Sequence, residues 1–189
     1  MPRAGVTTER VIEEAELLAD EGGLADVTLA RIAERLNVKV PSLYKHVAGL
    51  DAVRASVETR ATADLGQTLG RAAVGVSGDD AVDALAHAYR DWAKRHPGRY
   101  GAILKAPDPS DDAAMAASAA AVQIVFDALA GYGLTGDDAI DATRAFRAAL
   151  HGFVSLEAAG GFGLPQDVDR SFAQLVNALK AGLKNWSTL

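Results

Sequence analysis

The chain has 189 residues, of which 49% are hydrophobic and 23% charged, a composition that supports one or two ordinary globular domains with a buried core. It contains no cysteine, which excludes disulfide frameworks, thiolate metal centres and cysteine nucleophiles. The net charge of −6 disfavours nucleic-acid binding by the surface as a whole, because phosphate neutralisation needs clustered lysine and arginine.

The local patterns indicate a helical protein without a targeting signal. Residues 1–10 lack the apolar run of a signal peptide, and no stretch approaches the ~18 uninterrupted apolar residues of a membrane span. We therefore expect a cytoplasmic protein with no membrane partner. Nearly every segment repeats its apolar residues with the period of an α-helix, and none alternates like a half-buried strand. These patterns predict an all-α fold of about nine helices.

The first predicted helix begins after Thr7 or Thr8, either of which can cap it, and stops at Gly22-Gly23. One side of this helix is apolar and should face the core; it consists of Val11, Ile12, Ala15, Leu18 and Ala19. The opposite side is acidic, with Glu9, Glu13, Glu14, Asp20 and Glu21. Because these carboxylates would repel phosphates, we do not expect the helix to lie along DNA.

A helix-turn-helix is predicted next. Thr28 can cap a short helix whose apolar residues repeat at i, i+3, i+4 and i+7, namely Leu29, Ile32, Ala33 and Leu36. The pattern breaks at Asn37, which tolerates the left-handed conformation of a tight turn. Pro41 suits the first turn of the following helix, and Leu43 and Val47 would point back toward the preceding one.

The rest of the chain also has helical periodicity. A long helix is predicted from Leu50 toward Gly75, and another over residues 79–96 that ends at Pro97-Gly98. We expect a turn over 99–105, a loop with two prolines and three acids over 107–112, and then an alanine-rich helix that ends at 131–133. Two long helices over about 137–159 and 167–186 complete the predicted order.

The predicted helix-turn-helix is the basic part of an acidic chain. Residues 31–47 contain four lysines or arginines and one glutamate, a local net charge of +3. In such a motif the N-terminal residues of the second helix face base edges, and residues further along contact the phosphate backbone. We assign base contacts to Lys39, Val40, Pro41 and Ser42, backbone contacts to Tyr44, Lys45 and His46, and a further candidate DNA contact to Thr28. A small three-helix core without any DNA-binding role remains the alternative from periodicity alone.

The segment from Val11 to Val53 resembles the DNA-binding domain of the TetR family of bacterial repressors. The resemblance rests on Leu29-Ala-Arg-Ile-Ala-Glu-Arg-Leu36 and Val38-Lys-Val-Pro-Ser-Leu-Tyr-Lys-His-Val47. Leu50 stands where family members commonly carry a phosphate-contacting lysine, and Asn37 replaces the turn glycine. The first difference removes one expected backbone contact, whereas the second preserves the turn conformation.

The C-terminal half resembles the ligand-binding domain of a TetR subgroup. The similar segments are Tyr89-Arg-Asp-Trp-Ala-Lys-Arg-His-Pro-Gly-Arg-Tyr100 and Leu150-His-Gly-Phe-Val-Ser-Leu-Glu157. The second is similar to a Trp-His-Gly signature, although no tryptophan precedes His151. The resemblance implies a DNA-binding domain at 1–50 and a ligand-binding and dimerisation domain at 51–189. It also implies a homodimeric repressor that binds palindromic operator DNA and is released by a small, largely apolar effector.

Two residue sets follow for the C-terminal half. The candidate dimer face consists of Ile140, Leu150, Val154, Phe172, Leu175, Val176, Leu179, Leu183 and Trp186. The candidate ligand pocket consists of Tyr89, Trp92, Tyr100, Leu104, Phe126, Phe146 and His151, of which His151 would be the polar anchor. For both sets the alternative is an ordinary intrachain core.

We predict no enzymatic activity, metal or cofactor. The four histidines are widely separated, and none has the spacing of a metal-binding motif. The glycine-rich segment 160–163 follows a helix rather than a strand, which disfavours a dinucleotide site. The alternative functions are a helical ligand-binding or adaptor protein without specific DNA binding and, less well supported, a helical enzyme with an unrecognised site.

Overall fold

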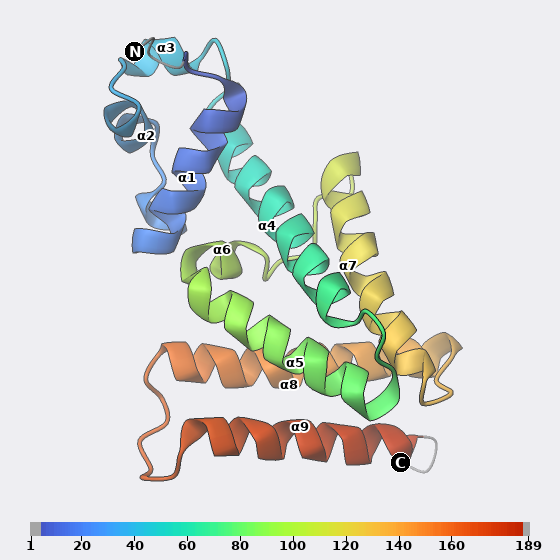
Figure 1. The fold of residues 1–189 in the computed structure, drawn as a ribbon. Helices are drawn as coiled ribbons and strands as arrows, with labels where there is room; N and C mark the ends of the chain where they lie inside the picture. The colour runs from blue at the N-terminus through green and yellow to red at the C-terminus, as the bar shows by residue number, and fades with distance from the viewer. Residues whose placement is uncertain (1–4, 187–189) are drawn as a thin grey trace. The chain divides into compact units, whose positions relative to one another are not determined.

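The computed structural model describes residues 5–186, which form nine α-helices and one short 3-10 helix, without β-strands (Figure 1). The predicted all-α class is therefore confirmed. The elements in chain order are α1 (Thr8–Gly22), η1 (Leu24–Asp26), α2 (Leu29–Arg35), α3 (Val40–Leu43), α4 (Leu50–Ala72), α5 (Gly78–Arg95), α6 (Pro97–Ala102), α7 (Asp112–Ala130), α8 (Gly136–Ala158) and α9 (Val168–Lys184).

The helices form two compact units. The described part of unit 1 comprises residues 5–63 and 95–117, and that of unit 2 comprises residues 64–94 and 118–186. The chain passes between the units within α4 and α7 and at the last residue of α5. Unit 1 thus contains α6 in addition to the helix-turn-helix. The division of roles at residue 50 concerns function and stays a prediction.

Unit 1 encloses its own hydrophobic core. All five apolar residues predicted to face inward from α1 are buried, and they pack with Ile32 and Ala33 of α2, Leu43 of α3 and Val53 and Val57 of α4. Thr7 is the residue that caps α1, since its side chain accepts a hydrogen bond of 3.2 Å from the backbone N–H of Arg10. This core fixes the two short helices, α2 and α3, that carry the candidate DNA contacts.

Helix α6 corrects the predicted turn over 99–105. Pro97 occupies its first turn, where a missing backbone N–H costs nothing, so the proline that ends α5 also starts α6. Asp20 of α1 accepts hydrogen bonds from the backbone N–H of Arg99 (3.0 Å) and from its Nε (2.7 Å). The Asp20 carboxylate also lies 3.2 Å from His96 Nδ1. These bonds join α6 to α1 inside unit 1.

In unit 2, α8 and α9 run side by side in opposite directions (Figure 1). Two lysines of α9 bind carboxylates of α5: Lys180 Nζ lies 2.7 Å from Asp83 Oδ2, and Lys184 Nζ lies 2.6 Å from Asp79 Oδ2. Near the other end of α5, Arg90 is 6% exposed and donates to both carboxylate oxygens of Glu157 in α8, at 2.8 and 2.6 Å. These ion pairs join α5 to both α8 and α9.

Within residues 5–186, α7 is the one helix that is long and apolar enough, by length and composition alone, to cross a membrane. Its mean hydropathy is 1.7, and much of this value comes from its many alanines. In unit 2 the helix faces two glycines of α4. A Cβ atom at Gly66 would lie 3.3 Å from the Cβ of Ala121, and one at Gly70 would lie 3.4 Å from Cδ1 of Ile124. The C-terminal half of α7 therefore packs closely against α4.

Candidate nucleic-acid interface and apolar groove

The turn before α3 has the predicted geometry. Asn37 has a positive φ of 52° and is the only described non-glycine residue with one. The chain then returns to the core, because the backbone N–H of Val38 donates to the carbonyl of Ala33 at 2.9 Å and Leu43 is fully buried. Thr28 caps α2 by accepting from the backbone N–H of Arg31 at 3.2 Å. The predicted helix-turn-helix is present in unit 1.

Half of the eight candidate DNA contacts are exposed to solvent. Lys39, at the N-cap of α3, and Pro41 are exposed, as are Tyr44 and Lys45 just beyond the end of this helix. The remaining candidates are half-buried: Thr28, Val40, Ser42 and His46. Val40 also packs against the core of unit 1, which restricts its access to a thymine methyl group. The structure brings the eight candidates into one unit, and their roles on DNA stay predictions.

A hydrogen bond fixes the C-terminal side of this segment. Thr8 Oγ1, in the first turn of α1, donates to the carbonyl oxygen of His46 at 2.9 Å. The two residues are 38 positions apart in the chain. The acceptor is a backbone atom, so no side-chain pattern could have predicted this bond. It holds the exposed pair Tyr44 and Lys45 close to the first turn of α1.

The acidic side of α1 is occupied by intramolecular ion pairs. Arg35 of α2 binds Glu21 at 2.5 Å and lies 3.6 Å from Glu14, while Arg60 of α4 binds Glu9 at 2.6 Å and Glu16 at 2.9 Å. Burial raises the pKa of the Glu16 carboxyl, and the Arg60 charge opposes this shift. Of the carboxylates that we expected to repel DNA, Glu9, Glu14 and Glu21 therefore hold α1 against α2 and α4.

The same pairing reduces the number of cations available to DNA. Of the four in residues 31–47, Arg31 pairs with Asp26 and Arg35 pairs with Glu21. Lys39 and Lys45 are exposed and have no ion-pair partner among residues 5–186. The basic patch expected from the sequence therefore reduces to two unpaired lysines at opposite ends of the α3 segment.

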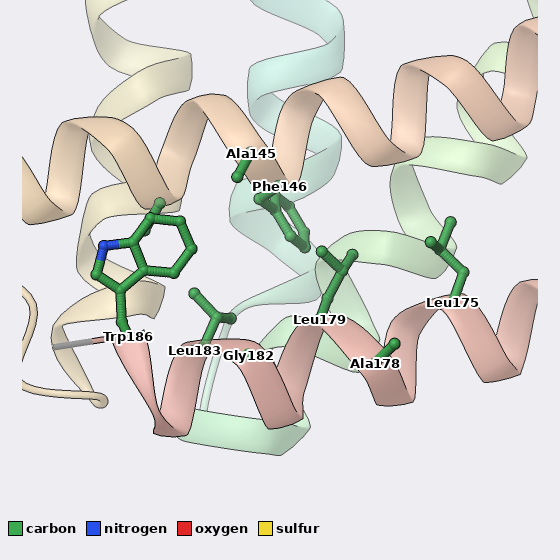
Figure 2. A pocket seen from close by; sticks show the side chains of 9 residues that line it. Ala145, Phe146, Leu175, Ala178, Leu179, Gly182, Leu183 and Trp186 are labelled. Carbon is green, nitrogen blue, oxygen red and sulfur yellow. The ribbon is translucent and has the colours of Figure 1, made fainter. Parts of the chain in front are cut away.

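Unit 2 contains an apolar groove between α8 and α9, with a volume of about 180 Å³. Side chains of both helices point into it from opposite sides (Figure 2). We call it the α8–α9 groove; its lining residues are Ala142, Ala145, Phe146, Leu175, Ala178, Leu179, Gly182, Leu183 and Trp186. None of these side chains is charged, and four are alanine or glycine.

The candidate dimer residues divide into two groups. Leu150, Val154, Phe172, Val176 and Leu183 are at most 4% exposed, so the single chain already covers them. Leu175, Leu179 and Trp186 are half-buried and line the α8–α9 groove, and Ile140 is 39% exposed. Sequence periodicity identified the apolar sides of α8 and α9 but did not separate the core side from the outer side. The surface available to a second chain is the outer one.

The candidate ligand residues are distributed over both units. Tyr89, Trp92 and Phe146 are buried in unit 2, where Phe126 and His151 are half-buried. In unit 1, Tyr100 is buried and Leu104 is 45% exposed. Their role in ligand binding stays a prediction.

One polar partner in unit 2 was not anticipated. Trp92 Nε1 donates to Asp64 Oδ2 of α4 at 2.9 Å, which satisfies the only donor of a side chain that is 1% exposed. The one sequence signal for Asp64 is a carboxylate within a predicted helix that otherwise contributes apolar residues to the core. No group of three or more histidine, aspartate or glutamate side chains within residues 5–186 is arranged to hold a metal ion.

A buried three-helix core with a helix-turn-helix, next in the chain to a larger helical unit, defines the class of helical DNA-binding regulators. The family model described as "Tetracyclin repressor-like, C-terminal domain" matches residues 82–179. An uncharacterised HTH-type transcriptional regulator of Mycobacterium tuberculosis (strain H37Rv) is 38% identical over 98% of this chain and 85% of its own length. The uncharacterised HTH-type transcriptional regulator YobS of Bacillus subtilis (strain 168) is 35% identical over 96% of this chain and 95% of its own length.

A solved structure shows the same fold. TetR-Q116A from Acinetobacter baumannii AYE, crystallised in complex with minocycline, has a TM-score of 0.71 at 20% identity and covers 96% of this chain and 98% of its own. The family match and the two relatives establish membership: the chain belongs to the TetR family and is a one-component transcriptional regulator. The relatives are regulators and not enzymes, in agreement with the absence of a catalytic motif in the sequence.

Proposed function

We propose that this regulator represses transcription by binding a palindromic operator as a homodimer, and that a small, largely apolar effector releases it. The observation that supports DNA binding is that Lys39 and Lys45 are exposed and unpaired, whereas both arginines of the helix-turn-helix are ion-paired. Lys39 stands at the N-cap of α3, the end that faces base edges in this motif. Lys45 follows α3 and is placed to contact the phosphate backbone.

The homodimer is proposed because one copy offers few unpaired cations to the DNA phosphates. Two free lysines neutralise few phosphates, so a single helix-turn-helix should bind DNA poorly at physiological salt. Two copies related by a two-fold axis double these contacts and read two half-sites about 34 Å apart. The α8–α9 groove supports dimerisation through these two helices, because its lining is entirely uncharged and includes half-buried or exposed residues of both.

The effector is proposed to bind among the aromatic residues of the C-terminal domain. Unit 2 offers the buried side chains of Tyr89, Trp92 and Phe146, and His151 as a half-buried polar anchor. The effector can release DNA only if it binds the DNA-free conformation more tightly than the DNA-bound one. The relatives are named as transcriptional regulators, which act on DNA, and we propose that the protein works in the cytoplasm.

A mobility-shift assay on the DNA that flanks the gene tests this function. The wild-type protein should retard specific fragments, and its affinity should fall steeply between 50 and 200 mM salt. Lys45→Ala should weaken binding, whereas Lys105→Ala, at an exposed lysine of unit 1 outside the helix-turn-helix, should not. Weak binding that is indifferent to sequence would instead favour a helical ligand-binding or adaptor protein. A thermal-shift screen of small apolar molecules tests the effector.

A further inference from the structure

The α8–α9 groove is one end of a longer exposed surface. On α8 this surface continues from Ala145 through Ala149 and Gly152 to Leu156. Spacings of four, three and four residues place all four on one side of the helix. We call these four residues the outer stripe of α8. Only the last has a large side chain, and it is 52% exposed in the last turn of the helix.

The two ends of the outer stripe have complementary shapes. At one end, Ala145, Ala178 and Gly182 leave a hollow between the helices (Figure 2). At the other end, Leu156 projects into solvent. Ala145 and Leu156 are eleven positions apart, which corresponds to about 17 Å at the 1.5 Å rise of an α-helix. The hollow and the projecting leucine therefore lie on the same side of one helix, about 17 Å apart.

The middle of the stripe has almost no side chain. Gly152 is exposed, and a Cβ atom there would meet nothing within 4 Å. Ala149, nearly one turn away on the same side of α8, has only a methyl group, so another helix can approach here at the short end of the usual 8–10 Å interaxial range. It also lies about midway between the hollow and the leucine.

The end of α8 that carries Leu156 is held by local contacts. The carbonyl oxygen of Leu156 accepts from the backbone N–H of Gly161 at 2.8 Å. The ring of Phe162 lies 4.7 Å from that of Phe153, which in turn lies 5.1 Å from Phe172. The leucine is therefore presented from an ordered helix end, next in the chain to a loop with two more exposed apolar residues, Phe162 and Leu164.

We propose that a second copy of this chain covers the outer stripe, with the two-fold axis passing between Ala149 and Gly152. Each copy then inserts its Leu156 into the α8–α9 groove of the other. A two-fold interface joins the same patch of both subunits and must be self-complementary. The groove at Ala145 and the projecting Leu156 lie at about equal distances from the centre at Ala149 and Gly152, so the patch meets this requirement. The inference rests on the homodimer proposed above and specifies its register.

Cysteine cross-linking tests the register directly, because the chain has no cysteine of its own. Gly152→Cys alone should form a covalent dimer under mild oxidation, since the two copies of this position meet near the axis. The double variant Leu156→Cys with Gly182→Cys should also cross-link between copies. Within one chain these positions are too far apart, because Gly182 lines the groove beside Ala145 and a disulfide needs Cα atoms within about 7 Å.

Three controls accompany the test. Neither Leu156→Cys nor Gly182→Cys alone should cross-link, because each meets the other position across the interface. Val74 is an exposed turn residue of unit 2, and Val74→Cys should form no covalent dimer on non-reducing gels. Leu156→Glu should retain its helical circular dichroism and weaken dimerisation at least tenfold in sedimentation experiments. If Leu156→Glu dimerises as strongly as the wild type, the proposal is overturned. The occupant of the groove would then be a small ligand or a different protein.

The register and the homodimer fail in distinguishable ways. A protein that sediments as a dimer but shows no cross-linking of Gly152→Cys or of the double variant contradicts the register alone. Cross-linking of Leu156→Cys to itself would also contradict it, because the copies would then pack with like ends together. A wild-type protein that is monomeric at all concentrations contradicts both the register and the homodimer.

Discussion

Gly98 of α6 lies directly against the main chain of Ala19 in α1, so closely that a methyl group at position 98 would overlap the Ala19 carbonyl. Both residues are in unit 1 and both are buried. The overlap would involve backbone atoms, which cannot rotate away as a flexible side chain could. Glycine at position 98 is therefore a requirement for packing α6 against the helix-turn-helix unit.

Gly98→Ala should lower the free energy of unfolding by roughly 2–3 kcal/mol, because the helices must separate to accommodate the methyl group. Urea denaturation measures this change. Gly101→Ala is the matched control in the same helix, since a Cβ atom there meets nothing within 4 Å. Alanine at that position should be neutral or slightly stabilising. Equal effects of the two substitutions would argue against the close approach of α6 and α1.

Asp20→Ala should also weaken the contact between α1 and α6. The Asp20 side chain is 16% exposed and accepts two hydrogen bonds from Arg99, one from the backbone and one from the guanidinium. Its removal leaves these donors without their acceptor, at a cost of about 1–3 kcal/mol. Glu13→Ala, at an exposed acid of the same helix, should change stability by less than about 0.5 kcal/mol. If both variants unfold at the wild-type urea concentration, the Asp20 contact is not stabilising.

The pair Arg90 and Glu157 should make the stability of unit 2 depend on pH. The hydrogen bond from Arg90 holds the pKa of the Glu157 carboxyl below its ordinary value of 4.5. Since the folded-state pKa is depressed, this stabilisation is present above about pH 4.5 and is lost as the pH falls through the folded-state value. Glu157→Gln should therefore be less stable than wild type at pH 7, and the difference should shrink below pH 4.

Chemical denaturation of both proteins between pH 3 and pH 7 measures this difference. Glu34→Gln, at an exposed glutamate of α2, is the control and should follow the wild-type curve throughout. A stability difference between Glu157→Gln and wild type that stays constant down to pH 3 would exclude the assigned ionisation.

The roles assigned to the candidate DNA contacts predict two kinds of effect on DNA binding. Tyr44→Ala and Lys45→Ala should weaken binding to all sequences alike, because backbone contacts carry no sequence information. Lys39→Ala and Ser42→Ala should change which bases are preferred, each by about 1–3 kcal/mol at the affected position. Binding to a library of operator variants separates the effects. Identical sequence preference in all four variants would contradict this division of roles.

Short-range sequence signals predicted the helix-turn-helix well. The cap at Thr28, the left-handed turn at Asn37 and the proline in the first turn of α3 depend on neighbouring residues, and the structure has all three. Helix α6 was missed because Pro97-Gly98 is also a strong stop signal for α5, and periodicity cannot detect a helix of six residues.

Long-range contacts were beyond the reach of the sequence. Arg90 and Glu157 are 67 positions apart, and Asp20 and Arg99 are 79 apart. Nothing in local periodicity pairs such residues. The same limit explains the candidate dimer face: both sides of α9 carry apolar residues, and only packing distinguishes buried Phe172 from half-buried Leu179. Neighbouring chain positions cannot supply that information.

Nuclease footprinting of the DNA that flanks the gene tests the central claim most directly, because it reports sequence specificity and two-fold symmetry together. The wild-type protein should protect a palindromic segment whose half-sites lie about one helical turn apart. The double variant Lys39→Ala with Lys45→Ala should lose this protection, and Lys105→Ala should retain it. Protection without dyad symmetry, or protection that survives in the double variant, would contradict DNA recognition by a homodimer through α3.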